Sequence, residues 1–321
     1  MSAARYVIRR LAAAVTLLAV VATLTFALVH LAPGDPVYLF AGDGGTPEYY
    51  AEVRRVLGLD RPLPVQLAHY LARVARGDLG RSLHQGQPVA ALIGHRALAT
   101  VLLAGTAFVV AAVTGVALGT WAATRAYGWG DRILLVATSV GAALPVFWTA
   151  LLLALVFSLH LDWLPVQGMR SARPPASAWA AAVDVASHLV LPVVALSLQP
   201  CAAFSRVMRA KMLEALAEPY VRTARAKGLA ARGVLFHAAR NALLPVVTVI
   251  GGYATVLVTG AVLTETVFAW PGLGRLALDA TLARDYPVIL GTVLVASVGT
   301  IVINLVTDLL YAVVDPRITY A

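Results

Sequence analysis

The stretch from Ala97 to Thr124 reads ALATVLLAGTAFVVAAVTGVALGTWAAT and contains no Asp, Glu, Lys or Arg. An α-helix rises about 1.5 Å per residue, so about 20 apolar residues cross the ~30 Å hydrocarbon layer of a bilayer. In that layer every backbone N–H and C=O group needs a partner within the protein, and a helix supplies one for nearly all of them. The stretch therefore predicts a membrane-spanning helix.

The composition of the whole chain agrees with this prediction. The 321 residues are 60% hydrophobic and only 13% charged, and the mean hydropathy is +0.80. These values are typical of an integral membrane protein and exclude an intrinsically disordered chain. The single cysteine, Cys201, has no intramolecular partner, which excludes a disulfide scaffold.

Five further stretches also lack Asp, Glu, Lys and Arg. They are Leu11–His30, Ile133–Leu161, roughly His188–Ser205, Ala242–Thr264 and Tyr286–Thr307. We therefore expect an all-α integral membrane protein with six transmembrane helices. The sequence signal is weakest for the fourth span, because its uncharged core is short and contains Pro192 and Pro200.

Three local features refine these spans. Pro145 removes a backbone donor inside the third stretch, so a bend is expected there. Gly115 and Gly119 form a GxxxG pattern, which can let helix backbones approach closely but arises easily by chance in a Gly- and Ala-rich span, so we interpret it as ordinary packing. The first stretch is long and no A-x-A cleavage site follows it, which favours a retained anchor over a signal peptide.

The distribution of basic residues predicts the orientation of the spans. The net charge is +9 and the isoelectric point is near 10.0. With the N-terminus inside, fourteen of the 25 basic residues lie in inner segments and only four in the short outer loops. The other seven lie in the long segment between the first two spans, which carries little weight. We therefore place both termini in the cytoplasm and expect no nucleic-acid partner.

The long segment at residues 32–96 has the signals of a folded external insert. Thr46-Pro47-Glu48 is typical of a helix start, and Gly58 is expected to end that helix. A second helix is predicted from Pro64 to Arg76, with Gly77 as its end. A loop that merely joins two spans would need neither signal.

The segment at residues 206–240 contains eight basic residues and only two acidic ones. In a generic membrane protein such a patch binds anionic lipid headgroups. Here Pro219 starts a short helix that ends at a glycine, so about two turns would stand clear of the bilayer. We expect this helix to dock on a partner protein through Tyr220, Val221, Arg222, Thr223, Ala224, Arg225, Ala226, Lys227 and Gly228.

Together with Asn241–Pro245, this helix resembles the cytoplasmic signature of ABC importer permeases of the dipeptide, oligopeptide and nickel branch. Four further blocks resemble that branch in the same order: HLAPGDP at 30–36, LGLDRPLPVQ at 57–66, RGDLGRS at 76–82 and TETVFAWPGLG at 264–274. The resemblance covers nearly the whole chain, and the long insert points to the first of the two permeases that such importers pair.

The resemblance implies the transmembrane domain of a type I ABC importer. Its parts would be an N-terminal anchor helix at 1–31, the extracytoplasmic insert at 32–96 and the permease domain at 97–321, with the coupling segment at 206–240. The implied function is half of an alternating-access pathway for dipeptides or oligopeptides. Nickel chelates, haem and glutathione remain alternative substrates, because importers of this branch resemble one another.

The resemblance also implies partners. A second homologous permease would complete the pore, two cytoplasmic ATPases would bind ATP and magnesium, and an extracytoplasmic binding protein would deliver the substrate. In that family the short helix seats in a groove of the ATPase and transmits its motion. Arg222-Thr223-Ala224 replaces the acidic start of the broader importer signature, so no acidic role is assigned to Arg222.

Other candidate sites are weaker. Glu265 and Trp270 lie in the block near the last outer loop and are candidate residues of an external gate or docking site, although a hydrated position at the membrane boundary would also explain Glu265. The same boundary position is the preferred interpretation of Asp308. The seven histidines show no HExxH spacing, and there is no GxSxG elbow, so we predict no metal site, no bound cofactor and no catalysis.

The composition of the spans also separates the function classes. An ion-coupled transporter would be expected to place charged residues within its spans, and these six stretches contain none. A structural or lipid-binding protein would explain the basic patch but not the five ordered blocks. No Walker phosphate loop exists, since neither Lys211 nor Lys227 precedes Ser or Thr. This chain is therefore not expected to bind ATP in the Walker manner, and the resemblance assigns ATP to a separate subunit.

Overall fold

The structure is a computed structural model that describes residues 3–31, 37, 44–56, 58–173 and 176–314. Within these ranges all regular elements are helices, and the only strand-like pairing is an isolated bridge between Arg81 and Pro88. Residues 32–36 and Leu57, which belong to two of the sequence blocks, lie outside the described residues.

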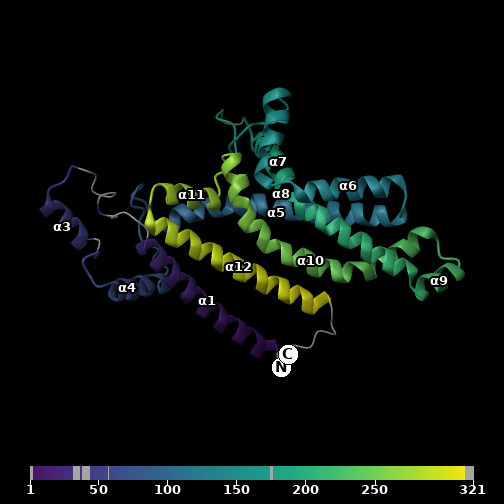
Figure 1. Cartoon of the computed structure of the whole chain (residues 1–321), viewed down its shortest axis with the longest axis horizontal. Coiled ribbons are helices and arrows are strands. Elements are labelled where there is room, and N and C mark those ends of the chain that lie inside the picture. Colours follow the sequence, from purple (N-terminus) through teal and green to yellow (C-terminus); the bar gives the residue numbers. More distant parts are fainter. Residues whose placement is uncertain (1–2, 32–36, 38–43, 57, 174–175, 315–321) are drawn as a thin grey trace. The chain divides into compact units, whose positions relative to one another are not determined.

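The helices follow one another along the chain as labelled in Figure 1. They are α1 (Ala3–Leu31), α3 (Pro47–Val56), α4 (Leu63–Ala75), α5 (Val89–Thr124), α6 (Trp129–Ala143), α7 (Val146–Leu153), the π-helix η1 (Ala154–His160), α8 (Ala178–Ala217), α9 (Pro219–Ala226), α10 (Ala231–Val267), α11 (Leu273–Leu282) and α12 (Tyr286–Val314).

Among the residues that the structure describes, five helices are long and apolar enough to cross a membrane, namely α1, α5, α8, α10 and α12. A sixth crossing exists if α6 is counted together with α7 and η1, which are bent by 105° at a short break. This architecture confirms the all-α membrane fold predicted from the six uncharged stretches.

The predicted bend at Pro145 is confirmed. Leu144, the residue before the proline, has an extended backbone (φ −77°, ψ 130°), as expected because a following proline disfavours helical geometry. The break removes the helical partners of nearby carbonyl groups, and the Gln199 side chain of α8 supplies one by donating a hydrogen bond to the Leu144 carbonyl at 2.9 Å. In Figure 1, α7 accordingly runs across the direction of α6.

The fourth span, which has the weakest sequence signal, lies in the longest of the described helices. The 40 residues of α8 continue through Pro192 and Pro200. Ser177 starts the helix, since its hydroxyl accepts a hydrogen bond from the Ala180 N–H at 3.1 Å. Prolines are tolerated in spans that neighbouring helices support, and the middle of α8 is largely buried. Burial therefore outweighs the cost of the two prolines.

The residues group into two compact units. Unit 1 comprises Met1–Leu98 and Gly272–Val302, and unit 2 comprises Ala99–Pro271 and Ile303–Thr319. In unit 1, α1, α4 and the start of α12 meet around Phe26, Tyr70 and Leu290. The start of α5, α11 and α12 enclose a second cluster in that unit. Figure 1 shows α1 beside α12.

Unit 2 is built around α8. The C-terminal half of α8 packs with the ends of α5 and the start of α10 through Met208, Met212 and Val246, all fully buried. Its N-terminal half packs with α5 and Trp270, and on another side with α7 and Phe268.

The glycines of the GxxxG pattern lie at a close contact between α5 and α8. A Cβ at Gly119 would lie 2.4 Å from the Ser205 carbonyl oxygen, and one at Gly115 would lie 2.8 Å from the Cβ of Phe204. No larger residue fits there without moving the backbone. The GxxxG pattern therefore serves helix packing, because the absence of a Cβ at both glycines allows α5 and α8 to lie this close together.

The two helices predicted for residues 32–96 are present as α3 and α4. The Thr46 hydroxyl accepts a hydrogen bond from the Tyr49 N–H at 3.3 Å, which satisfies one free donor of the first turn. Gly58 and Gly77 have φ angles of +69° and +78° and follow the two helices, as the sequence predicted.

Candidate functional site

The predicted docking residues Tyr220–Gly228 form the short helix α9 and its C-terminal cap. Pro219 occupies the first turn, where its missing N–H costs no hydrogen bond. At the other end, the Gly228 N–H bonds to the Arg225 carbonyl at 3.0 Å and the Leu229 N–H bonds to the Ala224 carbonyl at 3.1 Å. These two hydrogen bonds, together with the φ angle of +78° at Gly228, form a Schellman motif that ends the helix.

The side chains of α9 are divided into one anchor and an exposed face. Val221 is only 1% exposed and Ala224 is partly buried, whereas every other residue from Pro219 to Gly228 is exposed. The exposed set includes the three basic residues Arg222, Arg225 and Lys227. The helix is thus anchored mainly through Val221, and the rest of its surface is exposed.

The support for α9 is the tightly packed end of unit 2. Helix α9 contacts α8, which precedes it, and α10, which follows it. Beneath it, Met212 and Ala215 of α8 pack against Ala238 and Ala242 of α10. The block Asn241–Pro245, which resembles the family signature together with α9, therefore lies on a helix that carries α9.

A buried ion pair braces the same part of α8. The Arg209 guanidinium donates hydrogen bonds to both carboxylate oxygens of Asp131 on α6, with 2.6 Å between Nη2 and Oδ2. Asp131 is 1% exposed and also accepts a hydrogen bond from the Tyr127 N–H at 2.8 Å. The pair links residues 78 positions apart, so sequence spacing alone offered no signal for it. In the sequence, Arg209 is one of the eight basic residues of the segment at 206–240.

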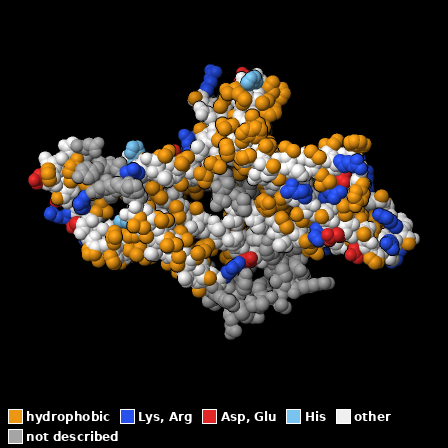
Figure 2. All heavy atoms as spheres, in the orientation of Figure 1, with side chains coloured by type: hydrophobic (Ala, Val, Ile, Leu, Met, Phe, Trp, Pro, Cys, Tyr) orange, Lys and Arg blue, Asp and Glu red, His pale blue; other side chains and the backbone are white. Residues whose placement is uncertain are grey.

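Basic side chains surround this support as well. Arg206 on α8 donates a hydrogen bond to the Thr138 carbonyl at 3.0 Å, and Arg125 and Arg132 lie over the rings of Trp121 and Trp129. Figure 2 shows Lys and Arg side chains gathered over the end of unit 2 that carries α9, whereas hydrophobic side chains cover much of the adjoining helices. The surface therefore changes from apolar to basic towards α9.

The second predicted site, Glu265 and Trp270, has the opposite surroundings. Both residues are fully buried, at the end of α10 and just after it. The Thr100 hydroxyl donates a hydrogen bond to Glu265 Oε1 at 2.6 Å, and the Trp270 indole N–H donates to the Ala99 carbonyl at 2.9 Å. The Trp270 backbone N–H bonds to the Glu265 carbonyl at 2.8 Å. The two residues thus join the end of α10 to α5.

The part of the chain that the structure describes contains no group of three or more His, Cys, Asp or Glu side chains that could hold a metal ion. Asp308 lies on α12 and is partly buried.

The chain matches two family models. The model described as binding-protein-dependent transport system inner membrane component matches residues 115–320, and its N-terminal companion matches residues 3–104. Together they cover nearly the whole chain, including both α9 and the segment from Glu265 to Trp270.

Individual relatives match over the same length. The probable peptide ABC transporter permease protein y4tP of Sinorhizobium fredii is 41% identical over 316 residues, with 98% of this chain and 99% of the relative covered. The dipeptide transport system permease protein DppB of Escherichia coli is 40% identical over 335 residues, with the same coverage. The glutathione transport system permease protein GsiC of Salmonella typhimurium is 40% identical over 316 residues and is covered to 99%.

The helical membrane fold, the exposed basic helix on a rigid support and these full-length matches agree with one another. The chain belongs to the family of inner membrane components of binding-protein-dependent transport systems.

Proposed function

We propose that the chain is a permease subunit of an ATP-driven importer and forms half of a translocation pathway for dipeptides or short peptides. A second, similar permease would complete the pathway. The observation that carries the proposal is the geometry of α9, which exposes three basic residues and is held by one buried anchor in a chain matched throughout by peptide permeases.

The proposal includes an orientation. Both termini and α9 lie in the cytoplasm, where fourteen of the 25 basic residues would then be found. The helices α3 and α4 belong to an extracytoplasmic insert at residues 32–96, beside the permease domain at 97–321. A binding protein delivers the substrate on that outer side.

In this arrangement α9 couples the permease to a separate ATPase. Two ATPases bind ATP and magnesium, and their closure pushes on Tyr220–Gly228. The Arg209–Asp131 pair and the packed end of α8 support this transfer, because a rigid base passes a displacement on rather than absorbing it. The long helices α8 and α10 then carry the motion towards the opposite face.

The test is a charge reversal on α9. We expect Arg225→Glu with Lys227→Glu to abolish stable ATPase association and peptide uptake by the reconstituted importer, because two repulsive contacts replace two attractive ones. Arg232→Glu with Arg240→Glu on α10 makes the same change of charge on exposed positions outside α9. Normal association and uptake in the α9 variant would refute the coupling role, and equal losses in both variants would assign the effect to net charge alone.

We further propose that Glu265 and Trp270 contribute to gating from within the protein. Their full burial supports an internal brace between α5 and α10 more than a contact made directly by either side chain with a docked protein. A change in the angle of α10 would have to break or carry along this brace.

Glutathione is a second candidate substrate. The observation that favours it is the match to GsiC, which is as close as the match to DppB. Competition for uptake between radiolabelled dipeptides and glutathione, measured with the cognate binding protein present, separates the two substrates.

A further inference from the structure

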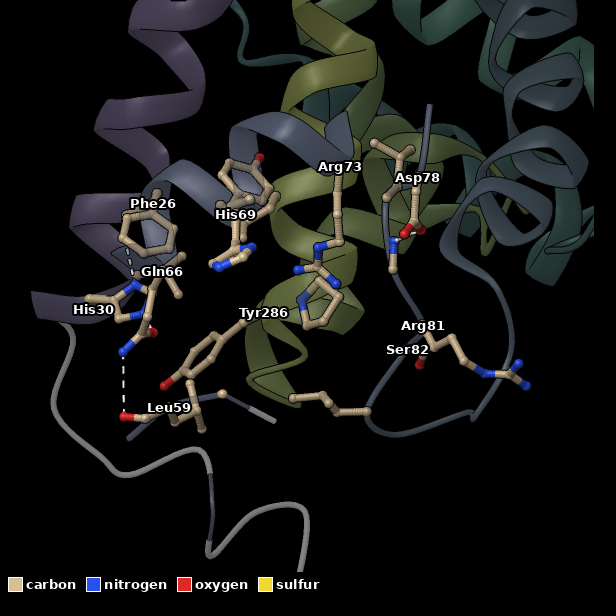
Figure 3. A pocket seen from close by; sticks show the side chains of 18 of the residues that line it. Phe26, His30, Leu59, Gln66, His69, Arg73, Asp78, Arg81, Ser82 and Tyr286 are labelled. Atoms are coloured by element: carbon tan, nitrogen blue, oxygen red, sulfur yellow. Dashed lines mark hydrogen bonds between the residues drawn. The ribbon is translucent and has the colours of Figure 1, made fainter. Parts of the chain in front are cut away.

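A cavity with a volume of about 940 Å³ lies within unit 1. Its walls come from the end of α1, from α4, from the loop that precedes α5 and from the start of α12. Figure 3 shows Arg73 and Tyr286 reaching into this space, while Arg81 turns away from it. Neither the coupling role of α9 nor the brace at Glu265 uses this cavity.

The cavity is strongly basic. Four arginines and two histidines line it, and Asp78 is the only acidic residue among them. The Asp78 carboxylate accepts a hydrogen bond from the Gly80 N–H at 2.8 Å. The nearby Asp285 is also engaged, because the Ser82 hydroxyl and two backbone N–H groups of the same loop donate to it. Neither acid therefore forms an ion pair with the lining arginines in the described structure.

Three of the arginines already have partners. Arg55 donates to Glu52 at 3.0 Å, Arg61 donates to His69 Nε2 at 2.9 Å, and Arg81 donates to the Gly86 carbonyl at 2.7 Å. Among the described residues, the guanidinium of Arg73 has no hydrogen bond and no ion pair. It lies beside Gly80, with Nη1 3.8 Å from the position of a Cβ there. The planar donor groups of Arg73 are thus available to an incoming anion.

His30 also lines the cavity, and both of its ring nitrogens have hydrogen-bond partners. Its Nδ1 faces the Phe26 carbonyl at 2.8 Å and its Nε2 faces Gln66 Oε1 at 3.3 Å. The Gln66 amide nitrogen donates to the Arg61 carbonyl at 2.8 Å, which assigns Oε1 as an acceptor. Both ring nitrogens of His30 therefore face oxygen acceptors of the same chain.

Two phenol groups beside the cavity lack partners. The hydroxyls of Tyr70 and Tyr286 are buried and form no hydrogen bond among the described residues, and Tyr70 as a whole is only 7% exposed. Burial raises the pKa of Tyr70 to about 12, so its hydroxyl remains a neutral donor at physiological pH. Buried polar groups normally have a partner, so these two hydroxyls are donors available to a polar ligand in the cavity.

We propose that this cavity binds a small amphiphilic molecule by its oxyanion, a carboxylate or a phosphate, with Arg73 as the principal contact. The hydroxyls of Tyr70 and Tyr286, which have no partner among the described residues, are further donors beside the cavity. The rings of Phe26 and the two tyrosines, with Leu79 and Leu290, supply apolar walls for the rest of the ligand. The C-terminal carboxylate of a peptide is the source that the proposed function supplies, and this assignment of the source rests on that function.

The experiment measures ligand binding to the full chain in nanodiscs of phosphatidylcholine. The probes are the dipeptide Ala-Phe and the same dipeptide with a C-terminal amide. We expect the free carboxylate to bind more tightly, and Arg73→Gln to weaken its binding roughly tenfold or more, since a charge-assisted hydrogen bond is lost. Arg76→Gln is the matched control, because Arg76 is exposed at the end of the same helix and does not line the cavity.

Tyr286→Phe provides a second, independent variant. It removes a buried hydroxyl without a partner, so the melting temperature without ligand should stay the same or rise, while the affinity for Ala-Phe should fall. A lower melting temperature together with unchanged affinity would contradict the site.

A lipid-binding experiment distinguishes the two sources of the oxyanion, a peptide carboxylate and a lipid phosphate. Nanodiscs containing phosphatidylglycerol are compared by native mass spectrometry, which counts retained lipids. Retention that falls in Arg73→Gln but not in Arg76→Gln identifies a lipid phosphate as the ligand. If neither the dipeptide nor the lipid depends on Arg73, the proposal is overturned.

Failure of this site is distinguishable from failure of the proposed function. Peptide uptake by the complete importer without Arg73-dependent binding to the chain would overturn only the site. Absence of uptake by the wild-type importer would overturn the proposed function and would leave an Arg73-dependent oxyanion site in place.

Discussion

Helix α9 and the segment from Glu265 to Trp270 come from sequence blocks that resemble the same family, but their surroundings are opposite. Helix α9 buries only Val221 fully, whereas both Glu265 and Trp270 are completely enclosed. The charges of α9 are available to a partner, and the carboxylate of Glu265 contacts Thr100 of its own chain. Resemblance of a sequence block to a family therefore does not indicate whether its side chains are exposed to a partner or buried in the core.

Because of this contrast, substitutions in the two regions should affect stability and transport differently. Substitutions in the buried segment should reduce stability first, and transport as a consequence. Substitutions on the exposed face of α9 should reduce transport while stability stays nearly unchanged. Four sets of substitutions test this contrast, and their expected effects on the free energy of unfolding decrease from Trp270 to the exposed face of α9.

The largest effect is expected for Trp270→Ala. The substitution removes a fully buried indole and its hydrogen bond to the Ala99 carbonyl, and such a loss costs about 3–5 kcal/mol. The free energy of unfolding of the full chain in micelles measures it. Trp179→Ala is the matched control, because Trp179 is 78% exposed and should cost little. Equal losses in the two variants would contradict the structural role of Trp270.

A smaller but clear loss is expected for Gly119→Ala. The added Cβ would meet the Ser205 carbonyl oxygen at 2.4 Å, so α5 and α8 would have to separate, at a cost of about 1–3 kcal/mol. Gly105→Ala on the same helix has nothing within 4 Å of the new Cβ and should not destabilise the protein. If both alanines behave alike in thermal unfolding, the contact between α5 and α8 at Gly119 is not close.

Glu265→Gln should reduce stability by only about 1 kcal/mol, because the amide oxygen still accepts the Thr100 hydrogen bond while the charge is lost. If the brace takes part in gating, uptake and substrate-stimulated ATPase activity of the assembled importer should fall by more than this loss explains. Unchanged uptake and unchanged ATPase activity would remove Glu265 from the mechanism.

The smallest stability change is expected for the charge reversal of Arg225 and Lys227. Both side chains are exposed, so the free energy of unfolding should change by no more than about 0.5 kcal/mol. Loss of transport at this small cost would set α9 apart from the buried segment. A loss of several kcal/mol would mean that α9 is a packing element after all.

Several elements could be predicted because their signals are local. The bend at Pro145, the helices predicted after Thr46 and from Pro64, and the start and end of α9 all depend on residues within one or two turns. Proline, glycine and capping residues act through their own backbone, so their effect is visible in a single stretch of sequence.

The contacts that join distant stretches could not be predicted in this way. Asp131 and Arg209 pair across 78 residues, and Ser82 and Asp285 across 203. The GxxxG pattern indicated a possible close approach, but only the structure identified α8 as the partner of Gly115 and Gly119. The sequence likewise offered no sign that Arg73 and Tyr286 would line one cavity.

By itself, the sequence determined that this protein is helical and lies in a membrane, because backbone groups in hydrocarbon must pair within their own segment and uncharged runs of about 20 residues meet that demand. It also determined where helices bend and end. Only the tertiary structure decided which side chains are enclosed and which remain available. That property depends on neighbours from other segments, and it separates Trp270, a packed core residue, from Arg225, an exposed residue proposed to bind a partner.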